Sequence, residues 1–179
     1  MMKVVILNGN KEAAAFDEKL LIWAKQYPEN DYEVEIIQLR DLNVKYCTGC
    51  WGCWVKTPGQ CVFTDDSALV CKAMINADLV VFASPVKMGF VSSLLKKSMD
   101  KMIPLVHPYI EIVNGENHHQ KRYEKYPELA VLLETDKNTD DEDIEIITNI
   151  FKRLALNFKS DLKFVKLLET SEVAQLTQK

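Results

Sequence analysis

Cysteines are the residues of this chain most able to carry chemistry, and four of the five lie between positions 47 and 61. They are Cys47, Cys50, Cys53 and Cys61, so three thiols recur at every third position and the fourth follows a longer segment. Thiols at this spacing can converge on one point, as an iron–sulfur cluster, a zinc ion or a reactive thiol site requires. Zinc fits least well, because its sites usually place two ligand pairs further apart. The spacing therefore predicts either a [4Fe–4S] cluster or a thiol-only site.

The composition limits the kind of protein that carries these thiols. A chain of 179 residues with 47% hydrophobic residues can bury a substantial core, so we expect a single domain over residues 1–179. The net charge is −4 with both signs interspersed, which argues against a nucleic-acid partner or an anionic membrane surface. Apolar runs stay below the ~20 residues that span a bilayer, and the N-terminus shows no leader pattern. We therefore expect a cytoplasmic protein with reduced cysteines, whose odd number argues against a disulfide framework.

Short apolar runs alternate with amphipathic stretches along the chain. Strands are predicted at residues 3–7, 32–39, 78–83, 129–133 and 162–168. Helices are predicted at residues 13–27, 67–76, about 92–102 and 140–158. This alternation predicts an α/β fold, a doubly wound sheet of five parallel strands with helices on both faces.

Capping acids and irregular segments complete this outline. Asp65 and Asp66 precede the second predicted helix as N-terminal capping acids, and an acidic run opens the helix at 140–158. The cysteine loop occupies residues 45–64. Residues 104–127 fit no regular element, and we expect a long loop or lid there.

The informative loops all follow predicted strands. Residues 8–12 follow the first strand, the cysteine loop follows the second, and residues 84–90 follow the third. Doubly wound sheets bind ligands outside the carboxyl ends of their strands, where the strand order reverses. We therefore expect a binding site where these loops meet.

Three sequence features together resemble one family. The first is Gly9 in a loop that opens a helix, and the second is the cysteine segment followed by Asp65 and Asp66. The third is Ser-Pro-Val-Lys-Met-Gly at residues 84–89, which leads into the helical segment 93–101. On these features, which cover about the first hundred residues, the chain resembles the flavodoxin-like NAD(P)H-dependent FMN reductase family and its iron–sulfur flavoprotein branch.

This resemblance implies FMN as cofactor, with its phosphate at residues 8–14 and its ring along residues 84–89. A helix N-terminus offers N–H groups to a phosphate, and a glycine lets main chain approach a flat ring. The residues implied to hold FMN are Asn8, Gly9, Asn10, Lys11, Ala14, Ser84, Pro85, Val86, Lys87, Met88 and Gly89. The branch resemblance implies a [4Fe–4S] cluster on the four clustered cysteines.

The chain departs from the family pattern at two places. Residues 8–15 lack the Ser and Thr hydroxyls that usually follow the phosphate-loop glycine, and Glu12 brings a negative charge there. Lys87 stands where the family often has an aromatic residue, and a cation near the flavin would favour its anionic reduced form. The first departure motivates the alternative of a binding module without a cofactor.

The resemblance implies an FMN-dependent oxidoreductase. Such a protein takes electrons from NAD(P)H or a protein donor and passes them to a small acceptor, a quinone or flavin, or to a redox protein, and we expect a homo-oligomer. Flavin chemistry needs no protein nucleophile, so we name no catalytic side chain. The alternative within the same branch is a non-enzymatic electron carrier with a [4Fe–4S] cluster.

Further residues leave two interpretations open. Trp51 and Trp54 either border the flavin or pack at a subunit contact. The pair His118 and His119 either binds a metal or is solvated, and the basic residues 121–122 either meet a dinucleotide phosphate or are solvated. Cys71 lies on an apolar helix face, which favours a core position.

Overall fold

The computed structural model describes residues 1–12 and 15–168, and its centre is a sheet of five parallel strands in the order β2-β1-β3-β7-β8. The strands are β1 (Met2–Asn8), β2 (Tyr32–Gln38), β3 (Leu79–Lys87), β7 (Glu128–Glu134) and β8 (Leu162–Leu167). All five coincide with the predicted strands, and their parallel pairing confirms the doubly wound sheet.

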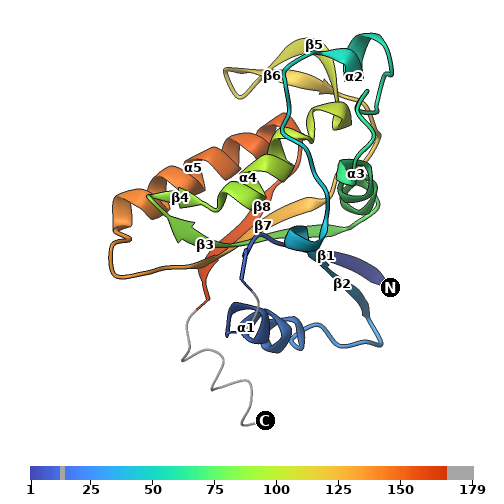
Figure 1. Ribbon diagram of the computed structural model, residues 1–179. Coiled ribbons are helices and arrows are strands. Elements are labelled where there is room, and N and C mark those ends of the chain that lie inside the picture. The colour runs from blue at the N-terminus through green and yellow to red at the C-terminus, as the bar shows by residue number, and fades with distance from the viewer. Residues whose placement is uncertain (13–14, 169–179) are drawn as a thin grey trace.

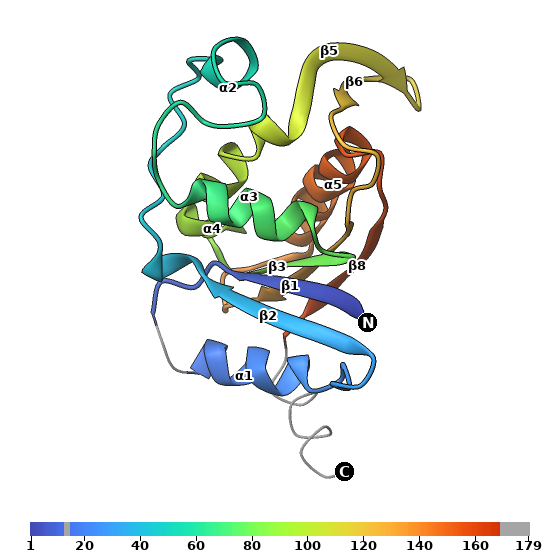
Figure 2. The ribbon, with the colours of Figure 1, turned by 90° about the vertical axis from the view of Figure 1, so that its right-hand side faces the viewer.

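Helices cover both faces of this sheet, as predicted. Figures 1 and 2 show α1 (Ala15–Ala24) on one face and three helices on the other. Those three are α3 (Ser67–Ile75), α4 (Ser93–Asp100) and α5 (Asp141–Asn157). None of the helices within residues 1–12 and 15–168 is long and apolar enough to cross a membrane.

The period-two alternation of a strand divides the buried side chains between two cores. From β1, Val4 and Ile6 pack on the α1 side with Trp23, whereas Val5 and Leu7 join the larger core beneath α3, α4 and α5. β3 lies between β1 and β7, and its residues 80–83 are fully buried, which explains their unbroken apolar run.

The start of α5 is defined by a capping box. The Asp140 carboxylate accepts from the Asp143 N–H (3.0 Å), while the Asp143 carboxylate accepts from the Asp140 N–H (3.2 Å). The predicted acidic cap is therefore confirmed. The buried face of the helix carries Ile147, Phe151 and Ala155, and the Phe151 ring lies 5.0 Å from that of Phe82 on β3.

The expectation of a long loop or lid at residues 104–127 was wrong, because most of this segment is regular. A short 3-10 helix (Ile103–Leu105) leads into an antiparallel hairpin of β5 (Val106–Val113) and β6 (Glu116–Lys121). Asn114 and Gly115 form its turn, with φ angles of 51° and 81°. Every residue of β6 is polar, so the strand shows no alternating apolar pattern.

The cysteine loop and this hairpin lie together above the helical layer, away from the sheet. Figures 1 and 2 both show α2 (Gly52–Val55), the helical turn within the cysteine loop, beside β5 and β6. The Trp54 indole joins the two segments, because its Nε1–H donates to the carbonyls of Ile103 (3.2 Å) and Val106 (3.0 Å). We refer to the cysteine loop (residues 45–64, which contain α2) together with the β5–β6 hairpin (residues 106–121) as the cap.

Candidate functional site

The loops that follow β1 and β3 are joined to each other at the carboxyl edge of the sheet. The Gly9 N–H donates to the Ala83 carbonyl (2.8 Å), and the Ser92 hydroxyl donates to the Gly9 carbonyl (2.6 Å). A Cβ atom on Gly9 would lie 2.7 Å from Leu95 Cβ, so the loop requires glycine to approach α4 this closely. The strand order reverses between β1 and β3, so the two loops meet where a doubly wound sheet binds ligands.

Asn8 stabilises the first of these loops from within. Its buried side chain donates to Asp17 (2.6 Å) and Gln38 (2.7 Å) and accepts from the Asn10 N–H (2.9 Å). Asp17 in turn pairs with Arg40 at 2.6 Å, which balances a carboxylate in the first turn of α1. The Asn8 side chain therefore fixes the loop rather than pointing out of it.

Lys11 and Glu12 lie exposed at the end of this loop, just before α1. The exposed Lys11 ammonium carries the charge that a phosphate needs, whereas Glu12 opposes it. Asn10 donates through its side chain to the Glu12 carbonyl (2.5 Å). Ala14, the remaining residue implied to hold FMN in this loop, lies outside the described residues.

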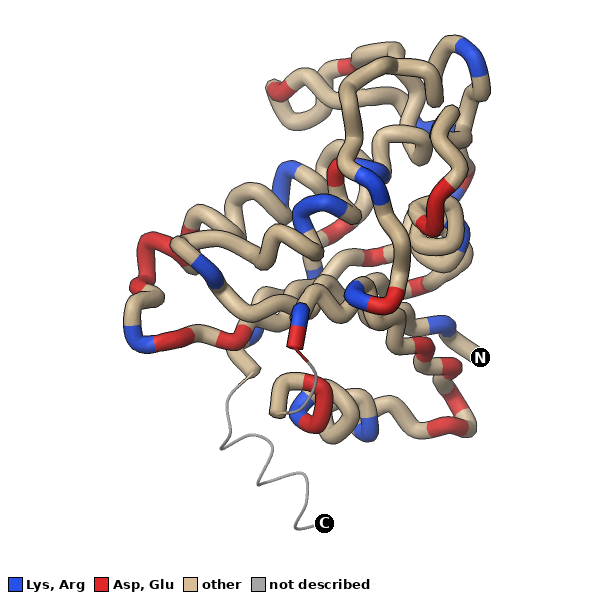
Figure 3. The backbone as a smooth tube through the Cα atoms, in the orientation of Figure 1, with Lys and Arg blue, Asp and Glu red and all other residues tan. Residues whose placement is uncertain are grey.

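The second loop, residues 84–89, is a continuation of β3 into a tight hairpin with β4 (Phe90–Val91). Met88 and Gly89 form the two-residue turn, with φ angles of 52° and 74°, the signature of a type I′ turn. A Cβ on Gly89 would lie 2.5 Å from the Asp143 Oδ1, so the turn rests against the start of α5. Figure 3 shows acidic segments gathered there.

Only part of this hairpin is accessible. Ser84, Pro85 and Val86 are buried, and the Ser84 hydroxyl accepts from the Ser92 N–H (2.8 Å). Lys87 and Met88 are exposed. The exposed Lys11, the joined loops and the glycine turn fit a phosphorylated cofactor with a flat ring, since they supply a cation and closely approaching main chain at one sheet edge.

The structure brings all four clustered cysteines to the wall of one small cavity of about 20 Å³. Cys47 and Cys50 are exposed, whereas Cys53 and Cys61 are partly buried. Within residues 1–12 and 15–168, no group of three or more His, Cys, Asp or Glu side chains is arranged to hold a metal ion. The thiols thus line one cavity, but in the part of the chain that the structure describes they do not converge to the ligating distance of a metal site.

Lys101, at the end of α4, lines the same cavity. Its Nζ lies 3.0 Å from the Cys61 Sγ and 3.1 Å from the Asp65 carboxylate, and the side chains of Lys101 and Asp65 are almost completely buried. Burial opposes the charge on the lysine, but its hydrogen bonds to Cys61 and Asp65 outweigh burial and raise the pKa of Lys101. A fixed positive charge therefore faces the thiols.

Asp65 does more than cap the next helix. Burial would raise its pKa, but hydrogen bonds from Ser67, the Lys45 N–H and Lys101 outweigh burial and lower the pKa to about 2. The predicted cap at Asp66 was wrong. Its side chain makes no cap hydrogen bond to α3 and instead accepts from the Asn43 N–H (2.7 Å).

The thiols differ in their surroundings. Hydrogen bonds from the Gly52 N–H and Thr48 lower the pKa of Cys50, whereas burial raises the pKa of Cys53. Burial also raises the pKa of Cys71 to about 12. The Cys71 thiol donates to the Lys101 carbonyl (3.4 Å), in keeping with a packed position on α3.

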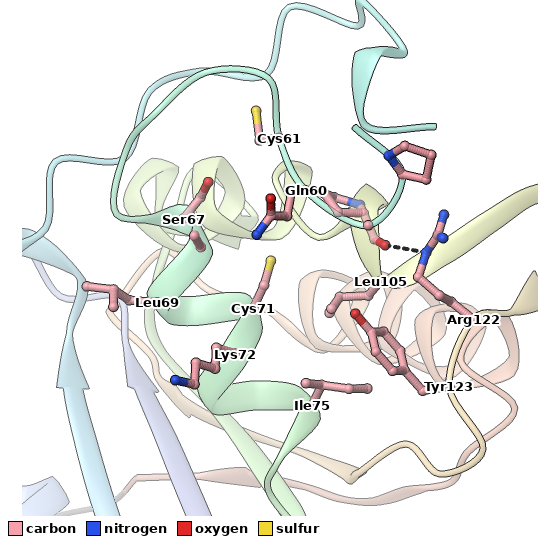
Figure 4. A pocket seen from close by; sticks show the side chains of 14 residues that line it. Gln60, Cys61, Ser67, Leu69, Cys71, Lys72, Ile75, Leu105, Arg122 and Tyr123 are labelled. Carbon is pink, nitrogen blue, oxygen red and sulfur yellow. Dashed lines mark hydrogen bonds between the residues drawn. The ribbon is translucent and has the colours of Figure 1, made fainter. Parts of the chain in front are cut away.

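Two larger cavities flank the cysteines. The first, of about 540 Å³, lies between the cap and α3. Figure 4 shows Cys61 and Cys71 on one side of it and Arg122 and Tyr123 on the other. Arg122 donates to the carbonyls of Pro104 (2.9 Å) and Val106 (3.2 Å), so its guanidinium is engaged in holding the hairpin.

The second cavity, of about 460 Å³, lies between the cap and the ends of α4 and α5. Trp51 and Trp54 stack with their rings 4.9 Å apart, and His119 lies 4.9 Å from Trp54. The tryptophan pair therefore borders the cysteines and the hairpin rather than the sheet edge. His118 is buried with its Nε2 3.4 Å from Glu116.

Sequence reasoning missed two features of this region. Lys101 was part of the recognised helical segment, yet nothing in the sequence placed it against the cysteines. The aromatic cavity was also missed, because it needs the hairpin that the polar residues of β6 concealed. The dipeptide Asn114-Gly115, typical of a two-residue hairpin turn, was the available signal.

Comparison with known proteins gives a family match. The sequence matches the family model described as NADPH-dependent FMN reductase over residues 2–122. It is 34% identical over 107 residues to an iron–sulfur flavoprotein of Archaeoglobus fulgidus, which covers 59% of this chain and 48% of that protein. An iron–sulfur flavoprotein of Methanocaldococcus jannaschii is 35% identical over 105 residues, covering 58% of this chain and 53% of that protein. The matched region thus spans about half the length of these curated relatives.

Among solved structures, the fold is similar to that of an NAD(P)H:quinone oxidoreductase from Methanothermobacter marburgensis. The TM-score is 0.65 at 15% sequence identity, with 99% of this chain and 93% of that chain covered. At this identity the likeness shows a shared fold.

Proposed function

Because this chain belongs to the NADPH-dependent FMN reductase family, we propose that it is a flavin-dependent oxidoreductase that passes electrons from NAD(P)H to a small acceptor. The observation that carries the proposal is the junction of the loops after β1 and β3 through Gly9, Ala83 and Ser92. This junction lies where the strand order reverses, which is the ligand-binding position of doubly wound sheets.

In this proposal the chain's own residues bind and orient the cofactor. Lys11 and the main chain of residues 9–12 hold the phosphate, and the Asp17–Arg40 pair keeps the carboxylate of α1 from repelling it. The turn at Met88 and Gly89 lies along the ring, with Lys87 beside it. FMN, when bound, supplies the two-electron and one-electron chemistry.

Binding of FMN is tested by titration of the purified full chain with FMN, followed by flavin fluorescence. We expect stoichiometric binding, and anaerobic NAD(P)H is expected to bleach the bound flavin. Lys11→Gln should weaken FMN binding several-fold, whereas Lys152→Gln, an exposed lysine on α5, should not change it. A chain that takes up no FMN would refute the proposal and favour the cofactor-free binding module.

The second candidate function is a non-enzymatic electron carrier with a [4Fe–4S] cluster at Cys47, Cys50, Cys53 and Cys61. It is favoured by the common cavity of these thiols and by the iron–sulfur flavoproteins among the relatives. The donor set fits a cluster, since four thiols are its usual ligands and the positive charge of Lys101 would partly neutralise the negative charge of the thiolate-bound cluster. The sulfurs would have to move closer together to ligate it.

Iron and acid-labile sulfide assays after anaerobic purification separate these two functions. About four irons and four sulfides per chain would support the carrier. Cys50→Ala should then abolish the iron content. Cys71→Ala, which lies outside the cavity shared by the four clustered cysteines, should retain it. Bound flavin that NAD(P)H fails to reduce would favour the carrier over the reductase.

Assembly into a homo-oligomer is part of the proposal. The apolar side chains of Tyr109, Ile110 and Ile112 on β5 are more than half exposed, which offers a surface for a second copy. Light scattering at micromolar concentration should give a mass above that of the 20.5 kDa chain. A strictly monomeric mass would count against it.

A further inference from the structure

A lysine nitrogen and a cysteine sulfur face each other where the cap meets the end of α4. The Lys101 Nζ lies 3.0 Å from the Cys61 Sγ, and the two residues are 40 positions apart in the chain. Among residues 1–12 and 15–168, Cys61 is the one cysteine with a lysine nitrogen at hydrogen-bonding distance. This sulfur therefore has a neighbour that the other thiols of the cysteine loop lack.

Burial fixes the position of the lysine nitrogen. The Lys101 side chain is only 2% exposed and pairs at 3.1 Å with the Asp65 carboxylate, which is fully buried. Asp65 is held in turn by the N–H groups of Lys45 (3.0 Å) and Ser67 (3.0 Å). An exposed lysine would sample many rotamers, whereas this nitrogen stays opposite the sulfur.

The sulfur side of the pair can be reached by small molecules. Cys61 is partly buried and lines two cavities, the one of about 20 Å³ that it shares with the other clustered thiols and the one of about 540 Å³ beside α3. Figure 4 shows Cys61 at one side of the larger cavity. A molecule as small as dioxygen can therefore reach the sulfur, while Lys101 stays enclosed.

One atom of dioxygen can join this nitrogen and sulfur in a balanced reaction. The pair carries three protons on its nitrogen and sulfur, whether it is a thiol with an amine or a thiolate with an ammonium. The O–O bond breaks, one oxygen atom forms the S–O and O–N bonds, and the other leaves with two of the protons as water. The third proton stays on nitrogen, where it can still donate to Asp65. Sulfur and nitrogen together supply the four electrons that reduce dioxygen.

The distance between the two atoms favours a bridging oxygen over a direct bond. Two single bonds through a bent oxygen span nearly the observed separation of 3.0 Å. A sulfenamide bond between Sγ and Nζ would instead draw the two atoms much closer together. Because Lys101 is held by Asp65, that movement would disrupt the buried ion pair.

We propose that Cys61 and Lys101 form a site of oxidative modification, at which dioxygen links Sγ and Nζ through an N–O–S bridge in the metal-free chain. The bridge ties the cysteine loop to the end of α4 and removes Cys61 from the set of four thiols. The reaction uses neither FMN nor NAD(P)H, so the proposal is independent of the oxidoreductase function.

The test is the intact mass of the full chain, purified without dioxygen in the presence of a metal chelator and then incubated in air-saturated buffer. We expect a form about 14 Da heavier, because the bridge adds one oxygen and removes two hydrogens. Trypsin should release residues 57–72 linked to residues 98–121, since the modified Lys101 no longer directs cleavage. Dithiothreitol, which reduces the S–O bond, should separate the two peptides.

Two variants should lose both the mass gain and the linked peptides. Lys101→Arg keeps a cation beside the buried carboxylate, so the variant should fold, but its guanidinium cannot take the place of the amine. Cys61→Ser removes the sulfur. Two matched controls should keep the modification. Lys97→Arg lies on the same helix but outside the cysteine cavity, and the Cys71 thiol that Cys71→Ser removes contacts the Lys101 carbonyl rather than its amine.

An unchanged mass after incubation in air would overturn the proposal, as would a gain of about 14 Da that persists in Lys101→Arg. A loss of about 2 Da as the sole change would show a disulfide or a direct S–N bond and would also overturn it. So would oxygen on Cys61 with Lys101 still cleaved by trypsin, which is ordinary thiol oxidation. None of these outcomes bears on the oxidoreductase proposal, which the FMN titration and flavin bleaching decide.

Discussion

At the sheet edge the loops after β1 and β3 are joined by a main-chain hydrogen bond from Gly9 to Ala83 and by close packing of Gly9, whereas the cysteine loop meets the rest of the chain at a buried ion pair. Asn8 and Ser92 use their side chains to fix the first region. In the second, Lys101 and Asp65 are buried while Cys47 and Cys50 remain exposed.

The difference shows two ways of presenting reactive groups. The sheet edge offers a rigid main-chain surface with few free side chains, which suits recognition of a large cofactor. The cap leaves nucleophilic and aromatic side chains accessible and relies on a small number of buried contacts to position them. Substitutions at the sheet edge should therefore destabilise the fold by disturbing close packing. Substitutions in the cysteine region should destabilise it by leaving a buried charge unpaired.

The largest expected effect is the loss of Lys101. Lys101→Met leaves the buried Asp65 carboxylate unpaired, which costs about 3–5 kcal/mol of unfolding free energy. Lys96→Met on the same helix removes an exposed pair with Asp100 and should cost less than about 1 kcal/mol. Urea unfolding monitored by circular dichroism measures both. Equal costs for the two variants would show that the buried Lys101–Asp65 pair does not hold the cysteine region in place.

Gly9→Ala probes packing at the sheet edge. The added methyl group would lie 2.7 Å from Leu95 Cβ, so we expect a loss of up to about 3 kcal/mol in unfolding free energy. Gly115→Ala is the control that separates the cost of a positive φ angle from the cost of a steric clash. Its Cβ would meet no atom within 4 Å, and only its φ of 81° opposes the change, at about 1 kcal/mol. An unchanged unfolding free energy in Gly9→Ala would mean that this edge of the sheet is not closely packed.

Acid should weaken the cysteine region through Asp65. The folded-state pKa of Asp65, about 2, lies below its ordinary value of 3.8, so its ionised form stabilises the fold above that ordinary value. This contribution, about 2 kcal/mol, is lost as the pH falls toward 2. The difference in unfolding free energy between the unaltered chain and Asp65→Asn should therefore narrow below about pH 4. A difference that stays constant down to about pH 2 would contradict it.

The smallest effect concerns thiol reactivity in the metal-free chain. Cys50 is exposed with a lowered pKa, and Cys71 has a pKa raised to about 12, so iodoacetamide should modify Cys50 first and Cys71 last. Cys53, whose pKa burial raises, should react a few-fold more slowly than Cys50. Mass spectrometry of timed digests gives the order. Fastest reaction at Cys53 would show that the loop opens.

Local patterns were enough to predict the sheet and its covering helices. The apolar run at residues 78–83 predicted β3, although the strand continues to Lys87 because β7 and β4 extend its pairing. The acids at the start of α5 predicted its cap, since a capping box depends only on residues close in sequence. The strand order and its reversal came from the structure.

The site could be predicted only where local spacing decides it. The cysteine spacing predicted a [4Fe–4S] cluster or a thiol-only site, and the structure places the four cysteines around one cavity. Lys101, by contrast, is in sequence an ordinary polar residue at a helix end. Its burial depends on Asp65, which is 36 positions away along the chain. The FMN residues at Asn8–Lys11 and Ser84–Gly89 remain a prediction that the titration will decide.

Among residues 1–12 and 15–168, the strands β5 and β6 pair with each other and with no other strand, and their hairpin is inserted between α4 and β7. The free energy of closing a connection grows only slowly with its length, so the sheet tolerates an excursion of this kind at small cost. Residues of the cap can therefore be exchanged, shortened or redesigned without altering strand register. Changes in the cap can therefore alter the surroundings of the cysteines while the sheet-edge loops that we propose to hold FMN keep their geometry.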